Sequence, residues 1–295
     1  IKNKSMEGIN VLSLFDGMSC GQIALEKAGI KVKNYFASEI DEYAIKITQK
    51  NYRDTVQLGS VTDIDGFGFP KIDLLTAGSP CQSFSNIGDG SGFDGKSGLF
   101  FEFVRLLNEV KPKYFLLENV VMKKEWQDKI SELVGCEPIK INSDVFSAQN
   151  RPRLYWTNIP NMSIPKSKGL VISDVIDPEF SDNYPKYLDM DFSGTKRKDL
   201  LRTPDQTSRC LTATMYKGQV SSFCRSNDGG VYRYTPKDCE ALQTVPIGYT
   251  EGVSNTQRYK MLGNGWTVDV IAHIFKHMWI PENPLLKEDI FTKVI

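Results

Sequence analysis

The sequence predicts an α/β fold, with a mostly parallel sheet and helices on both faces, and a smaller irregular second domain. Short apolar runs alternate with longer amphipathic runs as far as Pro160, and this order is typical of parallel strands joined by helices. Regular patterning then stops for about 75 residues. The 295 residues, 40% of them hydrophobic, can form one large core with a smaller domain.

Each predicted element is a periodic run bounded by turn residues. The first helix ends at Gly29, which suits the left-handed position after a helix, and Pro112 lies just beyond the third. A short apolar run between Gly and Pro residues is typical of a buried strand. We predict strands over 11–15, 35–38, 74–77, 114–117 and 154–157, and helices over 22–28, 42–50, 99–110 and 126–133.

The second half is organised differently. Residues 161–235 are rich in Asp, Ser, Gly, Lys and Tyr and have no sustained period. Regular patterns return over 236–242 and in an apolar helix after Thr267. We therefore expect a first domain over 8–160, a second over 161–235, a return to the first over 236–280 and a tail over 281–295.

Charge is unevenly distributed along the chain. The net charge is +0, yet residues 194–237 carry nine Lys and Arg against three Asp, a net +6. A basic patch on a neutral protein favours a polyanionic partner at one face, with a solvated surface loop as the alternative.

Cysteine and histidine usage favours a cytoplasmic, metal-free protein. The six cysteines show no CxxC pair and no metal-ligand spacing, which is typical of a reducing compartment. His273 and His277 have a spacing that can bind zinc, but no third ligand lies near, so they are expected on a C-terminal helix. No signal-peptide core or membrane-length apolar run is visible.

Cys81 and Glu118 follow two predicted strands. Cys81 comes just after the 74–77 run, and Glu118 ends the 114–117 run. Open α/β sheets bind ligands at the carboxyl ends of their strands. A thiol and a carboxylate at this edge are a nucleophile and a proton-handling group.

A cofactor site is predicted at the same edge. Phe15-Asp16-Gly17 ends the first strand, and Glu39 follows Gly17 by 22 residues, the spacing of an acidic residue that binds ribose hydroxyls. The loop lacks a full GxGxxG, which disfavours a pyrophosphate. A nucleoside without phosphates fits better, and S-adenosylmethionine is the common one. Phe15 either offers it an aromatic face or packs in the core.

These landmarks, with several others, make the chain resemble the DNA cytosine-5 methyltransferases over nearly its whole length. The opening Phe-Asp-Gly and Trp266 are similar to the animal de novo enzymes and to bacterial and phage relatives, and the latter likeness implies the cytoplasm of a bacterial or phage-infected cell. The resemblance implies a Rossmann-like class I methyltransferase sheet with a target-recognition domain. The shared motifs, in order, are Phe15-Asp16-Gly17, Glu39, Pro80-Cys81-Gln82, Gly98-Leu99-Phe100-Phe101, Glu118-Asn119-Val120, Gln149-Asn150-Arg151-Pro152-Arg153 and Gly263-Asn264-Gly265.

The resemblance also implies a mechanism. Cys81 would add to C6 of a cytosine flipped from a short duplex target, so that C5 attacks the methyl group of S-adenosylmethionine. Glu118 would hold the N3/N4 edge of the base. Arg153 would contact O2 and orient Glu118, with Arg151 beside it, because residues i and i+2 of one strand share a face. Asn119 is expected to brace its loop.

The implied binding residues form two sets. Ser60 stands where the family usually has an Asp, and Ser19-Cys20 where it often has Gly-Gly, which predicts weaker cofactor binding. The Gly- and Ser-rich segment over 82–97 is expected to close as a lid. The cofactor set is Phe15, Asp16, Gly17, Met18, Glu39, Ile40, Ser60, Val61, Pro80, Asn264 and Trp266; the double-stranded DNA set is Gln82, Ser85, Lys196, Arg197, Arg209, Thr214, Lys217, Gln219, Arg225 and Asn227.

Two alternatives stay open. One is a tRNA cytosine-5 methyltransferase of the same family. The other is a non-catalytic DNA-binding regulator on this fold, which we would expect to lack Cys81, Glu118 or the Arg pair, all of which are present. The expected product is S-adenosylhomocysteine, and the expected state is a monomer.

Overall fold

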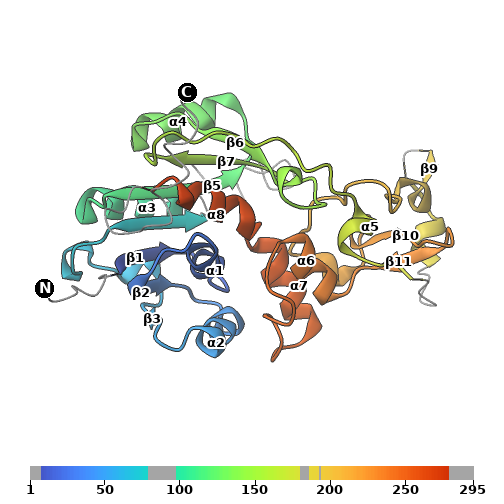
Figure 1. Cartoon of the computed structure of the whole chain (residues 1–295), viewed down its shortest axis with the longest axis horizontal. Coiled ribbons are helices and arrows are strands. Elements are labelled where there is room, and N and C mark those ends of the chain that lie inside the picture. The colour runs from blue at the N-terminus through green and yellow to red at the C-terminus, as the bar shows by residue number, and fades with distance from the viewer. Residues whose placement is uncertain (1–7, 79–97, 180–185, 193, 279–295) are drawn as a thin grey trace, which may run out of the picture. The chain divides into compact units, whose positions relative to one another are not determined.

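The computed structural model describes residues 8–78, 98–179, 186–192 and 194–278 (Figure 1). It forms two compact units. The first unit comprises Ile1–Ile141, Pro152–Ile164 and Ile271–Ile295, and the second comprises Asn142–Arg151 and Pro165–Val270. This division differs from the one expected from the sequence, because residues 236–270 group with the second unit. Their helices pack on elements of that unit.

A seven-stranded sheet organises the first unit, in the order β3-β2-β1-β4-β5-β7-β6. The pairs β2–β3, β1–β2, β1–β4 and β4–β5 are parallel, whereas β5 and β7 are antiparallel. The prediction of a mostly parallel α/β sheet is confirmed. The strands are β1 (Ile9–Leu14), β2 (Val32–Ser38), β3 (Val56–Gln57), β4 (Leu74–Gly78), β5 (Tyr114–Val120), β6 (Ile139–Asn142) and β7 (Pro152–Thr157).

The helices of the first half lie where the sequence predicts them. Asp41 caps α2 by accepting from the Tyr43 and Ala44 amides, and Gly29 has a φ of 71° after α1. His273 lies in α8, as predicted, whereas His277 follows its end. In the described ranges no helix is long and apolar enough to cross a membrane. The helices are α1 (Cys20–Lys27), α2 (Glu42–Asn51), α3 (Gly98–Val110), α4 (Lys124–Val134) and α8 (Val268–Lys276).

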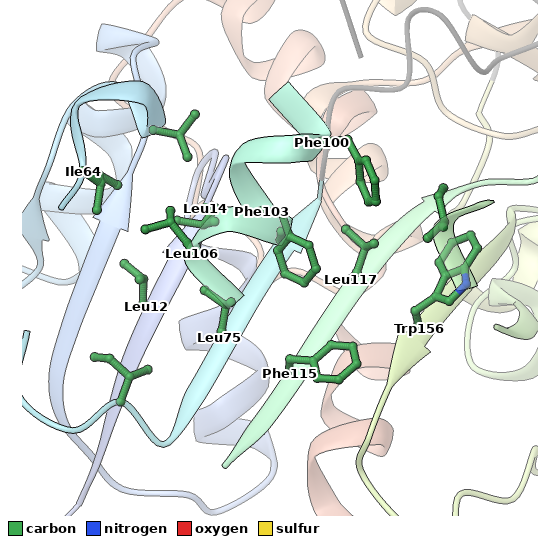
Figure 2. Close-up of a cluster of buried hydrophobic side chains, with 14 of the residues drawn as sticks. Leu12, Leu14, Ile64, Leu75, Phe100, Phe103, Leu106, Phe115, Leu117 and Trp156 are labelled. Carbon is green, nitrogen blue, oxygen red and sulfur yellow. The ribbon is translucent and has the colours of Figure 1, made fainter. Parts of the chain in front are cut away.

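The core of the first unit lies between α3 and the sheet. Phe100, Phe103 and Leu106 recur every third residue on α3 and point toward strand residues Leu75 and Leu117 (Figure 2). All five are at most 1% exposed. This spacing places apolar side chains on one helix face, so α3 holds the strands whose carboxyl ends carry the predicted site.

The second unit is irregular, with short strands and 3₁₀ turns. A small core of Leu188, Leu201, Phe223 and Val231 lies beneath its two hairpins. Helix α6 begins with a capping box in which Thr235 and Asp238 exchange hydrogen bonds. The elements are α5 (Ile172–Val175), β8 (Asp191–Phe192), β9 (Thr195–Lys196), β10 (Phe223–Arg225), β11 (Val231–Arg233), α6 (Pro236–Leu242) and α7 (Asn255–Asn264).

Candidate active site

The loop after β1 is tightly folded. Phe15, Gly17 and Ser19 have φ values of 55°, 59° and 61°, so two residues other than glycine adopt the left-handed region. The Asp16 carboxylate accepts hydrogen bonds from the Ser19 hydroxyl and, at 2.7 Å, from the Tyr35 hydroxyl. The strained backbone is thus held by side-chain bonds at the carboxyl end of β1.

The Asp16 carboxyl is poorly solvated. Burial raises its pKa to about 6, and the nearby charge of Glu39 acts in the same direction. Hydrogen bonds from Ser13, Ser19 and Tyr35 oppose the shift. Asp16 therefore changes charge near pH 6, about two units above an ordinary aspartate.

Glu39 joins this loop to the one after β2. Its Oε2 accepts from the Gly17 amide at 2.7 Å, and its Oε1 accepts from the Ile40 and Asp41 amides, both at 2.8 Å. A carboxylate has about four lone-pair sites, so these three bonds leave capacity for a further donor. The carboxylate is thereby fixed at the carboxyl end of β2.

The surroundings of Glu39 suit a nucleoside. Ile40 is 78% exposed and offers an apolar surface beside the carboxylate. A Cβ added at Gly17 or at Gly59 would meet nothing within 4 Å, which shows open space next to both loops. An acceptor for hydroxyl groups, an exposed apolar side chain and open space beside the backbone therefore occur in these loops, and their chemistry suits the ribose and adenine of S-adenosylmethionine.

Three other predicted cofactor residues have side chains that are buried or hydrogen-bonded within the protein. Met18 and Val61 are 1% and 4% exposed, so any ligand contact would come from their backbones. The Ser60 hydroxyl lies 2.8 Å from that of Thr62 and caps the short 3₁₀ turn that follows it.

Glu118 and Arg153 form an ion pair on neighbouring strands. The Arg153 Nε lies 2.9 Å from Glu118 Oε1, with the side chains 14% and 11% exposed. Arg153 also donates from Nη1 to the Pro152 carbonyl at 2.9 Å. Because a nearly buried guanidinium attracts a carboxylate strongly and directionally, the pair fixes the direction of Glu118. The predicted contact between these two residues is present.

The prediction that Arg151 shares a strand and a direction with Arg153 is wrong. Strand β7 begins at Pro152, and Arg151 lies before it in the second unit. Its guanidinium, on a residue 3% exposed, donates to the carbonyls of Leu211, Gly263 and Gly265. Backbone acceptors in the second unit thus determine its direction.

The predicted nucleophile follows β4. In the register of the parallel strands, Gly78, the last residue of β4, lies opposite Glu118. The chain therefore leaves β4 beside Glu118, three residues before Cys81. Pro80, Cys81, Gln82, Ser85 and the predicted lid over 82–97 lie outside the described residues.

In the second unit, several predicted DNA-reading side chains contact one another or nearby acids. Arg225 pairs with Asp199 at 3.4 Å, and Asn227 donates to Asp177 at 2.8 Å. Thr214 donates to Gln219 at 2.9 Å. Lys196, Lys217 and Asn264 are exposed, whereas Arg197 and Trp266 are half-buried. The last two cofactor candidates, Asn264 and Trp266, thus belong to this unit.

Two arginines that sequence reasoning did not single out as a pair lie together in this unit. The Nε atoms of Arg202 and Arg209 are buried without a hydrogen-bond partner among the described residues. Burial lowers the pKa of Arg209, and the charge of Arg202 lowers it further. Arg209 also donates to the Leu200 carbonyl at 2.8 Å. In the sequence, the excess of basic residues over 194–237 was the feature that indicated a role for Arg202.

Comparison with known proteins identifies the family. The model of the C-5 cytosine-specific DNA methylases matches residues 9–207 and 185–279.

The chain belongs to the C-5 cytosine-specific DNA methylase family.

Similar proteins support this assignment at the level of sequence and fold. The chain is 29% identical to the type II methyltransferase M1.ScrFI of Lactococcus lactis subsp. cremoris, over 94% of this chain and 79% of that protein. It is 28% identical to M.NlaX of Neisseria lactamica, over 91% and 95%. The fold is similar to that of the S. pombe Dnmt2 methyltransferase, with a TM-score of 0.69 and 21% identity over 90% of this chain and 97% of that one. As a C-5 cytosine-specific DNA methylase, the chain is a DNA cytosine-5 methyltransferase of the class that uses S-adenosylmethionine.

Proposed function

We propose that this chain transfers a methyl group to C5 of a cytosine flipped out of duplex DNA, through a covalent bond between Cys81 and cytosine C6. The observation that carries the proposal is the ion pair of Glu118 and Arg153, in register with the strand end that leads to Cys81. A stacked base is out of reach of a side chain on a sheet edge, so the cytosine must leave the helix.

The chemistry follows from the weak nucleophilicity of cytosine C5. The Cys81 thiolate forms a bond to C6, and the electron pair of the C5–C6 double bond becomes available at C5. C5 then takes the methyl group, and S-adenosylhomocysteine leaves. Water acts as the base that removes the C5 proton, and the thiolate is expelled as the double bond re-forms.

Glu118 and Arg153 stabilise the charge that develops on the ring. Addition at C6 places negative charge on N3 and O2. Glu118 holds the N3/N4 edge and favours a proton at N3, while Arg153 faces O2. Because the pair is nearly buried and already oriented, it needs little reorganisation during the reaction.

The methyl donor is S-adenosylmethionine, which supplies a methyl group activated by its sulfonium. Glu39 would accept from the ribose hydroxyls, and Ile40 would cover the adenine. Gly17 leaves room for the ligand to approach the backbone. Asp16 would hold the loop, and Ser60 would lie near the adenine amino group. Asn264 and Trp266 stay cofactor contacts predicted from the family resemblance.

DNA binding would come from the basic segment over 194–237 of the second unit. Lys196, Arg197 and Arg209 would contact phosphates, while Arg225, Gln219 and Asn227 would read base edges in the major groove. The pairing of Arg225 with Asp199 and of Asn227 with Asp177 implies that duplex binding exchanges these contacts. The type II relatives favour a restriction–modification role. A monomer stays the proposed state.

Methyl transfer from labelled S-adenosylmethionine to duplex DNA and to tRNA tests the function. We expect label in duplex DNA only, at sites that bisulfite sequencing then locates. Cys81→Ser should retain DNA binding and lose turnover, because a hydroxyl is a far weaker nucleophile than a thiolate. Label in tRNA alone would overturn the DNA assignment. Absence of a covalent adduct with 5-fluorocytosine DNA would overturn the Cys81 mechanism.

A further inference from the structure

Arg151 is one member of a closed ring of hydrogen bonds in the second unit. The proposed mechanism does not use this ring. Its Nη1 donates to the Leu211 carbonyl at 2.8 Å, and its Nη2 donates to the carbonyls of Gly263 and Gly265 at 3.0 and 2.9 Å. The Cys210 sulfur lies 3.3 Å from Nη1. One planar guanidinium thus joins two chain segments that lie more than 50 residues apart.

Two buried glutamines close the ring. Gln149 accepts from the Leu211 amide at 3.0 Å and donates to Gln243 Oε1 at 3.1 Å. Gln243 in turn donates to the Gly265 carbonyl at 3.1 Å. Gln149 and Gln243 are fully buried. Every backbone group in this ring would be costly to leave unpaired, so the arrangement resists displacement of either segment.

The two segments also touch directly. A Cβ added at Gly263 would lie 2.1 to 2.3 Å from the backbone of Thr212 and Ala213. No side chain fits there, because real Cβ atoms do not approach backbone so closely. The backbone at Thr212 is therefore packed against the end of α7 as closely as glycine allows.

The two joined segments lead to different predicted sites. Leu211 lies between Arg209 and Thr214 of the predicted DNA-binding set, whereas Gly263 and Gly265 flank Asn264 and precede Trp266. Both segments are hydrogen-bonded to the same guanidinium. A ligand that orders one segment therefore lowers the entropic cost of ordering the other.

We propose that Arg151 is a positioning residue that couples DNA reading to cofactor binding, by holding Leu211 and the Gly263–Gly265 turn in one rigid junction. This inference rests on the proposed function of the two segments. Arg151 then contacts neither base nor cofactor. Because linkage is reciprocal, duplex DNA and cofactor raise each other's affinity by the same factor.

The test compares the dissociation constant of S-adenosylhomocysteine with and without a saturating amount of duplex DNA. This duplex contains the enzyme's target site with its cytosine still unmethylated. We expect duplex to tighten binding by about 5-fold or more in the unchanged protein. Arg151→Lys keeps the charge but cannot span four acceptors, so the factor should fall toward one. Arg258→Lys is the matched control. Arg258 is also buried in the same unit but pairs with Glu240, so its replacement should lower stability and leave the factor unchanged.

Three results would overturn the proposal: a factor near one in the unchanged protein, a factor retained by Arg151→Lys, or an equal loss in Arg258→Lys. Where Arg151→Lys does not fold, amide hydrogen exchange of the unchanged protein decides. S-adenosylhomocysteine alone should protect the amides over 211–214, and unchanged exchange there would reject the coupling. Absence of any methylated target is a separate result, because it rejects the proposed function and not the junction.

Discussion

At the scale of single residues, the two arginines of the Gln-Asn-Arg-Pro-Arg motif serve different purposes. Arg153 pairs with Glu118, whereas Arg151 donates to backbone carbonyls. The family resemblance predicts the first contact, because it assigns Arg153 to orient Glu118. The spacing of the two arginines predicts the wrong direction for Arg151, because its backbone acceptors come from positions 60 to 114 residues later in the chain. No local pattern encodes such partners.

The Glu118–Arg153 pair leads to a kinetic prediction. Arg153→Met leaves a nearly buried carboxylate without its cation and removes the group that faces O2, so turnover should fall by about 10²–10³. The rate of adduct formation with 5-fluorocytosine DNA should fall with it, while the affinity for duplex changes little. Arg105→Lys, in an ion-paired arginine of α3, is the control and should keep turnover. Full activity of Arg153→Met would remove the pair from the mechanism.

The raised pKa of Asp16 leads to a prediction about stability. The folded state raises its pKa from 3.8 to about 6, so folding favours the protonated form. The stabilisation associated with this proton is complete below pH 3.8 and is lost as the pH rises through about 6. The free energy of unfolding, measured in urea, should therefore fall less in Asp16→Asn than in the unchanged protein as the pH rises from about 4.5 to about 7. Parallel pH dependence in the two proteins would show that Asp16 titrates normally.

At the scale of elements, a strand could be predicted from the sequence only where it was long enough to show an apolar run. The apolar runs of β1, β4 and β5 stand out, and Gly29 and Pro112 mark helix ends in the chain. Strands β3 and β6 are two and four residues long and are too short to show a period. Both lie at the edges of the sheet, and tertiary pairing alone defines them.

Helix α3 gives a prediction at this scale, since its apolar face forms the centre of the first unit's core. Phe103 is fully buried against β-strand residues, and Phe103→Ala leaves a cavity that the packed sheet cannot fill (Figure 2). Unfolding in urea should show a loss of about 3–5 kcal/mol. Phe67→Ala is the comparison, because Phe67 is 78% exposed and should change stability by less than about 0.5 kcal/mol. Equal effects of the two changes would place the core elsewhere.

At the scale of the whole molecule, the fold class follows from the alternating pattern, but the assignment of segments to units does not. Residues 236–270 have the regular periodicity of the first domain, yet they group with the second unit. Their buried Glu240 accepts from Arg258 and from the amides of Gly248 and Thr250, all within the same segment. Periodicity reports that a helix has an apolar face, and it does not report which unit that face meets.

The net charge of the molecule is zero, so affinity for duplex DNA must depend on where its cations lie. Arg202 and Arg209 are close enough to repel, and no acidic side chain in the described part of the chain pairs with either. A phosphate would relieve this repulsion and would accept from both guanidinium groups. Changing both to Gln should therefore weaken binding to all duplex sequences alike and lower the slope of log K against log salt by about 1.

Lys31→Gln is the control for this double variant. Lys31 precedes β2 at the amino ends of the strands in the first unit, opposite the predicted site, so its replacement should leave the slope unchanged. An unchanged slope in the double variant would place the phosphate contacts elsewhere in the basic segment, whereas a loss confined to one DNA sequence would make the pair a base reader.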